Sequence, residues 1–127
     1  MKNNTLRFLW IDDTEDWSKI TIKNITLLFK DVGITLIVDW FKNGDNIRPN
    51  LMRTDYDGVL IDYDLGAENG VSYITQIREH NQWNELLIIL YSSNTNTDLA
   101  SLVQDTANIK IAYRPNLNET ILDHFSH

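Results

Sequence analysis

Cysteine is absent from this chain of 127 residues, and glycine and proline are scarce, with five and two residues. The lack of cysteine excludes a disulfide framework, a thiolate zinc site and a cysteine nucleophile, and it fits a reducing compartment. So few glycines and prolines leave no segment with the composition of a flexible linker, and no internal repeat is visible. We therefore expect one domain over residues 1–127.

Positive charge is also in short supply, with 11 basic against 18 acidic side chains and a net charge of −7. The lysines and arginines are scattered, whereas nucleic-acid binding requires them to be clustered. The longest apolar runs, such as 86–91, fall far short of the ~20 residues of a membrane span. We expect a soluble, cytoplasmic protein that binds neither nucleic acids nor membranes.

Short apolar runs rich in β-branched residues alternate with amphipathic stretches. Near-continuous apolarity predicts strands that are buried on both faces, as in a parallel sheet, at 6–11, 34–40, 58–62, 86–91 and 109–113. Apolar residues at helical spacing predict the intervening helices. These faces are Ile22, Ile25, Phe29 and Val32, then Val71, Ile74 and Ile77, then Leu99, Leu102 and Val103, and finally Leu117, Ile121, Leu122 and Phe125. Pro49 makes the helix within 45–53 short, kinked or begun at the proline.

A strand followed by a helix thus occurs five times, and right-handed crossovers turn this order into a doubly wound α/β sandwich. Ligands of such sheets bind beyond the carboxyl ends of the strands. Polar or charged side chains follow four of the five predicted strands. They are Asp12 and Asp13 after the first, Asp62 and Asp64 after the third, Ser92 after the fourth, and Arg114 after the fifth.

The acidic side chains at these strand ends predict a metal site. Carboxylates a few ångströms apart must either take up a proton or bind a cation. Oxygen ligands without histidine or cysteine favour Mg²⁺ or Mn²⁺ over zinc. An aspartate beside such an ion can attack a phosphoryl group, and Ser92 and Arg114 supply a hydroxyl and a cation to hold that group.

Four motifs spread over the whole chain agree in spacing and identity with one known family. They are WIDD at 10–13, DGVLIDYDLG at 57–66 followed by Gly70, IILYSS at 88–93, and Arg114-Pro115. This set resembles the receiver domain of two-component response regulators. The resemblance implies a flavodoxin-like (βα)5 three-layer sandwich with a parallel sheet in the order 2-1-3-4-5.

The resemblance also implies roles for individual residues. Asp62 corresponds to the phosphoacceptor, and Asp12 and Asp13 to the acidic pair, with Asp13 as the direct ligand of Mg²⁺ or Mn²⁺. The backbone carbonyl of Asp64 is a further implied ligand, and Ser92 corresponds to the hydroxyl residue that bonds the phosphoryl group and moves on activation. The implied partners are a sensor histidine kinase or phosphotransfer protein and a downstream protein target, and a homodimer is compatible with this interpretation. Because the chain ends close to its fifth predicted helix, we expect signalling through partner contacts.

Three positions depart from the family pattern. Arg114 replaces a lysine that precedes a cis proline, Ile111 replaces a tyrosine or phenylalanine, and Gly66 replaces a proline. Arginine is larger than lysine and prefers bidentate pairing, so the first exchange is not conservative. These departures support an alternative hypothesis, a degenerate receiver that is never phosphorylated and acts as an interaction module.

A third hypothesis is an enzyme. Asp62-Tyr63-Asp64 has the DxD spacing of haloacid-dehalogenase-like phosphatases, and 61–66 is similar to receiver relatives proposed to process cyclic phosphates. The nucleophile of those phosphatases normally ends the first strand, whereas Asp62 ends the third predicted strand. We therefore favour a phosphoacceptor signalling domain over a phosphohydrolase.

Two further residues near the first strand carry expectations. Trp10 is predicted to lie in the core, close enough to Asp12 for its fluorescence to report metal binding. Thr14 is predicted to cap the first helix, and the acidic residues Glu15 and Asp16 complement the dipole of that helix.

Overall fold

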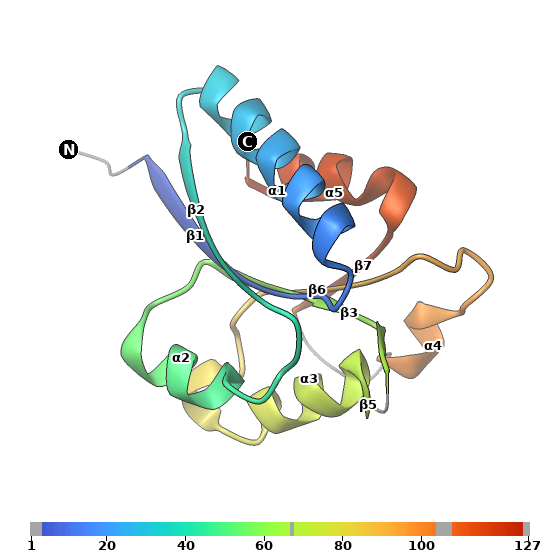
Figure 1. Cartoon of the computed structure of the whole chain (residues 1–127). Coiled ribbons are helices and arrows are strands. Elements are labelled where there is room, and N and C mark those ends of the chain that lie inside the picture. The colour runs from blue at the N-terminus through green and yellow to red at the C-terminus, as the bar shows by residue number, and fades with distance from the viewer. Residues whose placement is uncertain (1–3, 67, 104–107, 126–127) are drawn as a thin grey trace.

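A parallel sheet forms the middle of the molecule, in the order β2-β1-β3-β6-β7 (Figure 1). The structure is a computed structural model that describes residues 4–66, 68–103 and 108–125. The strands of the sheet are β1 (Thr5–Ile11), β2 (Thr35–Phe41), β3 (Gly58–Asp62), β6 (Ile88–Ser92) and β7 (Ile109–Tyr113). β4 (Asp64–Leu65) and β5 (Glu68–Asn69) form a small antiparallel hairpin after β3, which the sequence did not predict. Without this hairpin the strand order is 2-1-3-4-5, as predicted.

Helices cover both faces of the sheet and complete a flavodoxin-like three-layer sandwich. Figure 1 shows α1 and α5 on one face and α2, α3 and α4 on the other. The helices are α1 (Glu15–Asp31), α2 (Ile47–Arg53), α3 (Gly70–Arg78), α4 (Leu99–Leu102) and α5 (Leu117–Phe125), with short 3-10 turns η1 (Asn81–Trp83) and η2 (Arg114–Asn116). Within the described ranges, no helix has both the length and the apolarity needed to cross a membrane.

The burial of residues in the structure agrees with most of the apolar pattern of the sequence. Every residue of β3 and β6 is buried, as expected for central strands covered on both faces. Two predicted core residues are exposed instead, since Val32 is 56% and Leu102 is 44% exposed. Val32 lies just beyond the last residue of α1. Leu102 is the last residue of α4, which is only one turn long, and Val103 just beyond this helix is buried instead.

The predicted weakness of the second helix is confirmed. α2 has only seven residues, and Pro49 is the third of them. Proline is tolerated there because the first N–H groups of a helix have no partner within the helix. The helix begins two residues before the proline, so the alternative in which it starts at Pro49 is wrong.

Gly70 lets α3 begin directly against the backbone of Asp62. A Cβ at this position would lie 2.6 Å from the Asp62 carbonyl oxygen and 2.9 Å from side-chain atoms of Ile61 and Leu90. We therefore expect Gly70→Ala to lower the free energy of unfolding by about 1–3 kcal/mol, the usual cost of overpacking, in urea denaturation. Gly58→Ala is the matched control, because its Cβ would meet nothing closer than 3.6 Å. Equal losses in the two variants would contradict this close approach.

Candidate functional site

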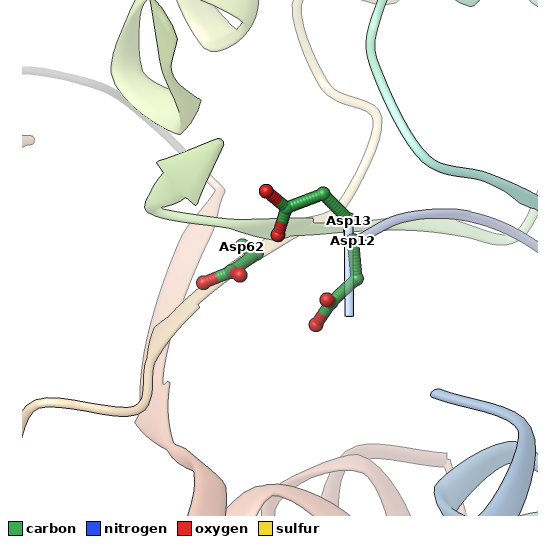
Figure 2. Close-up of side chains that lie close together, drawn as sticks. All are labelled: Asp12, Asp13 and Asp62. Carbon is green, nitrogen blue, oxygen red and sulfur yellow. The ribbon is translucent and has the colours of Figure 1, made fainter. Parts of the chain in front are cut away.

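Three aspartates converge at the carboxyl ends of β1 and β3. Ile11 pairs with Ile61 across these neighbouring strands, so Asp12 and Asp62 follow at the same level of the sheet. One carboxylate oxygen from each of Asp12, Asp13 and Asp62 lies within 4.8 Å of the others (Figure 2). Asp12 and Asp62 are buried, with 0% and 3% of their surface exposed, whereas Asp13 is exposed. The predicted meeting of these side chains is therefore observed.

This donor set fits a hard divalent cation. Mg²⁺ holds oxygen ligands at about 2.1 Å, so two of its ligand oxygens lie roughly 3 to 4 Å apart. The spread of 4.8 Å in the aspartate cluster is only slightly larger. Small side-chain movements or bridging waters would close this difference, and the exposed Asp13 gives water access to the site. The chemistry of the donors favours Mg²⁺ or Mn²⁺.

Asp62 lies in surroundings that disfavour its charged form. Burial of its carboxyl group and the negative charge of Asp12 raise the pKa of Asp62 from 3.8 to about 7. The N–H of Asp64, which donates to Asp62 Oδ1 at 3.3 Å, and the charge of Arg114 oppose this rise. Asp62 therefore lies in a pocket where a bound cation would favour its ionised form.

Asp12 is held in place by hydrogen bonds to both of its oxygens. Tyr91 Oη donates to Asp12 Oδ2 at 2.5 Å and accepts from Trp10 Nε1 at 2.8 Å. The N–H of Thr14 donates to Asp12 Oδ1 at 2.7 Å. Burial and the negative charge of Asp12 raise the pKa of Tyr91 well above its usual value, so its hydroxyl keeps the proton that it donates. Trp10 is fully buried, as predicted, and a chain of two hydrogen bonds connects it to Asp12.

Arg114 reaches from the end of β7 to the loop after β1. Its Nη2 donates to Thr14 Oγ1 at 2.9 Å and lies 3.6 Å from Asp12 Oδ2. The guanidinium also stacks over the ring of Trp17, 4.0 Å from its centroid. Thr14 does stand at the start of α1, but its hydroxyl does not cap the helix and accepts this bond from Arg114 instead.

Ser92 is fully buried at the end of β6. Its Oγ donates to Asp64 Oδ2 at 3.3 Å and accepts from the N–H of Asn94 at 3.0 Å. The exposed carboxylate of Asp64 is thus directed to Ser92 and lies outside the group of three aspartates. The hydroxyl and the acidic cluster are connected through Asp64, whose own N–H bonds Asp62.

The departures from the family pattern have structural consequences. Gly66 has a φ of +70° in the turn of the hairpin, a value that proline cannot adopt, so the family's proline would not fit this turn. The described residues contain no cis peptide bond, and that includes the bond between Arg114 and Pro115. Ile111 is half-buried against the core, while the hydroxyl of Tyr113 donates to the Thr97 carbonyl at 2.6 Å.

Sequence reasoning missed two aromatic residues of the site, Tyr91 and Trp17. The sequence pattern places Tyr91 only within an apolar strand and predicts no role for Trp17 in the site. A buried tyrosine hydroxyl needs a hydrogen-bond partner, so a tyrosine inside a wholly apolar strand next to Ser92 was the available signal. No comparable signal distinguishes Trp17, because its contact with Arg114 joins residues 97 positions apart along the chain.

A family model described as the response regulator receiver domain matches residues 8–112. A comparison with curated proteins finds no match. The matched range contains the three clustered aspartates and Ser92 but ends before Arg114.

Solved structures with the same fold include several response regulators. The chain is similar to a CheY-like receiver domain from Methylobacillus flagellatus, with 16% identity, a TM-score of 0.75 and coverage of 96% of this chain and 97% of the other. It is also similar to response regulator TrrA from Thermotoga maritima in complex with Mg²⁺-BeF, with 14% identity, a TM-score of 0.70 and coverage of 94% and 96%. The Mn²⁺-bound response regulator Rcp1 has 13% identity, a TM-score of 0.69 and coverage of 95% and 94%. At these identities the likeness concerns the fold.

Proposed function

The chain belongs to the response regulator receiver domain family, and from this premise we propose that it accepts a phosphoryl group on Asp62 and signals through altered protein contacts. The donor is a phosphohistidine of a sensor histidine kinase or phosphotransfer protein. The observation that carries this proposal is the convergence of Asp12, Asp13 and Asp62, with the carboxyl group of Asp62 buried among them. The proposed compartment is the cytoplasm.

The proposed reaction is an in-line displacement at phosphorus. A carboxylate oxygen of Asp62 attacks the phosphorus atom, and the P–N bond of the phosphohistidine breaks. The electron pair of that bond returns to the imidazole nitrogen, and Asp62 becomes an acyl phosphate. Because only ionised Asp62 attacks, groups that favour its charged form near neutral pH increase the reactive fraction of the protein.

The residues of the cluster are suited to hold a divalent cation during this step. We assign Asp13 and Asp62 as carboxylate ligands and the backbone carbonyl of Asp64 as a further ligand, with Asp12 beside them. When bound, Mg²⁺ or Mn²⁺ would neutralise the charge of the phosphoryl oxygens. Both ions occur in structural neighbours, as Mg²⁺-BeF in TrrA and as Mn²⁺ in Rcp1.

Arg114 and Ser92 have a second role in the proposal, as the groups that hold the phosphoryl oxygens. A phosphoryl group adds roughly −1.5 to −2 charges. Arg114 would then leave Thr14, and Ser92 would leave Asp64, to bond the new oxygens. These exchanges would move the strand ends that precede α4 and η2, and so would change the surface offered to a downstream protein.

Mg²⁺ should raise the melting temperature of the protein, because a ligand that binds only the folded state stabilises it. At an ion concentration 100 times the dissociation constant, the expected gain is about 2.7 kcal/mol. Asp13→Asn should lose most of the gain, since it removes an exposed ligand without creating a cavity. Asp98→Asn is a control, because Asp98 lies outside the aspartate cluster and accepts a hydrogen bond from the N–H of Ser101 at the start of α4. The measurement is thermal unfolding followed by circular dichroism across a Mg²⁺ titration.

The same Mg²⁺ titration distinguishes a receiver that accepts a phosphoryl group from a degenerate receiver that acts only as an interaction module. One observation supports the degenerate interaction module. Arg114 and Ser92, which would hold a phosphoryl group, already bond Thr14 and Asp64. An unchanged melting temperature at millimolar Mg²⁺ would favour the module and count against phosphoryl acceptance.

A further inference from the structure

The two buried aspartates of the site are held very differently. Asp12 receives hydrogen bonds at 2.5 Å from Tyr91 and at 2.7 Å from the N–H of Thr14, and Arg114 lies 3.6 Å away. Within the part of the chain that the structure describes, the carboxylate of Asp62 accepts only the hydrogen bond from the N–H of Asp64, at 3.3 Å. One carboxylate is therefore anchored, and its neighbour is nearly free to bind other groups.

The anchor of Asp12 is itself fixed by packing. Tyr91 is fully buried, and its hydroxyl accepts a 2.8 Å hydrogen bond from the indole of Trp10. The ring centroids of Trp10 and Tyr91 lie 6.3 Å apart in an edge-to-face arrangement, and those of Trp17 and Tyr91 lie 5.7 Å apart. Because neighbouring rings restrict the phenol, the carboxylate of Asp12 adjusts to Tyr91 rather than the reverse.

From this geometry we propose that Tyr91 is a positioning residue, which anchors Asp12 so that Asp13 and Asp62 remain available to the ion and the phosphoryl group. The inference rests on the proposed function. Figure 2 shows the side chains of Asp12 and Asp13 extending in different directions, which agrees with the separate hydrogen bond that Asp12 accepts from Tyr91. The hydroxyl of Tyr91 donates to Asp12 and not to the proposed phosphoacceptor, so it acts through the acidic pair.

Two physical effects make this anchor important for ion binding. Hydrogen bonds in a chain polarise one another, so the donor Trp10 strengthens the bond that Tyr91 gives to Asp12. Groups that orient the side chains of a metal site also matter in general, since their mutation costs about 10- to 100-fold in metal affinity, and Asp12 is one of the three carboxylates of this cluster. Without the phenol, Asp12 could turn toward Asp62 and compete with it.

The direct test is Tyr91→Phe, which keeps the ring and removes the hydroxyl. We expect at least about a 10-fold weaker affinity for Mg²⁺, measured by isothermal titration calorimetry on the folded protein. Tyr56→Phe is the matched control, because Tyr56 is also buried and donates to a carboxylate, that of Asp39, at 2.6 Å. Tyr56 precedes β3 at the opposite end of the sheet, so this variant should bind Mg²⁺ like the wild type.

A spectroscopic readout follows the same hydrogen bonds. Mg²⁺ should change the tryptophan emission of the wild type, and the part that Trp10→Phe removes reports Trp10. Tyr91→Phe should abolish this Trp10 component, because Tyr91 is the group that connects Trp10 to Asp12. Tyr56→Phe should leave it unchanged.

The outcomes separate this inference from the function on which it rests. If the wild type binds Mg²⁺ and is phosphorylated while Tyr91→Phe binds Mg²⁺ equally well, only the positioning role is overturned. The same holds if Tyr56→Phe loses as much affinity as Tyr91→Phe. If the wild type does not bind Mg²⁺, both proposals are overturned. Should Tyr91→Phe fail to fold, Trp10→Phe decides, because loss of the donor to Tyr91 should weaken Mg²⁺ binding and an unchanged affinity overturns the inference.

Discussion

Asp62→Asn should abolish the phosphoryl adduct that the wild type forms with acetyl phosphate and Mg²⁺. The amide has no ionised oxygen to attack phosphorus, whereas the shape of the side chain is almost unchanged. Its carbonyl oxygen can still accept from the N–H of Asp64, so the strand end and the hairpin should keep their conformation. We expect a complete loss of the adduct with an intact fold.

Intact-mass spectrometry measures this loss directly, as the absence of the mass increase of one phosphoryl group. Asp57→Asn is the control variant, because Asp57 is an exposed acid at the other end of the same strand and accepts a hydrogen bond from the N–H of Arg7. This control should form the adduct as the wild type does. An adduct that persists in Asp62→Asn would place the phosphoacceptor on another residue and refute the assignment.

The fold could be predicted because its strands and helices are local features of the sequence. The buried strands β3 and β6 are apolar at nearly every position, and their ends agree with the predicted ranges within two residues. The hairpin of β4 and β5 was not predicted, because strands of two residues are too short to have a periodicity. Exposure of Val32 and Leu102 depends on where α1 and α4 end, which apolar spacing alone does not determine.

The cluster of carboxylates could be predicted for a topological reason. Neighbouring parallel strands end at one edge of a sheet, so Asp12, Asp13 and Asp62 had to approach one another. The partners of the remaining groups depend on side-chain directions that no local pattern encodes. Ser92 bonds Asp64, and Arg114 bonds Thr14, because the segments that follow β3 and β1 place these partners beside the ends of β6 and β7.

The second large effect is a dependence of stability on pH in the metal-free protein. Asp62 has a pKa of about 7 in the folded state and 3.8 as an isolated group. Between these values the folded protein holds a proton that the unfolded chain has lost, so stability falls as pH rises. The contribution is fully present below pH 3.8 and is lost as pH passes through about 7. Because one pKa unit corresponds to about 1.4 kcal/mol, the full loss is on the order of 4 kcal/mol.

Urea denaturation in the presence of a chelator, from pH 4 to pH 8, measures this contribution as the difference between wild type and Asp62→Asn. Titrating groups far from the cluster affect both proteins similarly, so the difference reports Asp62 together with its coupling to Asp12. The wild type should lose stability relative to the variant as pH rises, and Mg²⁺ should reverse the loss, because the ion binds the ionised carboxylates. A difference that stays constant over this range would contradict the raised pKa of Asp62. A large difference would mean that the free protein sacrifices stability at neutral pH to keep an acidic site that only a cation completes.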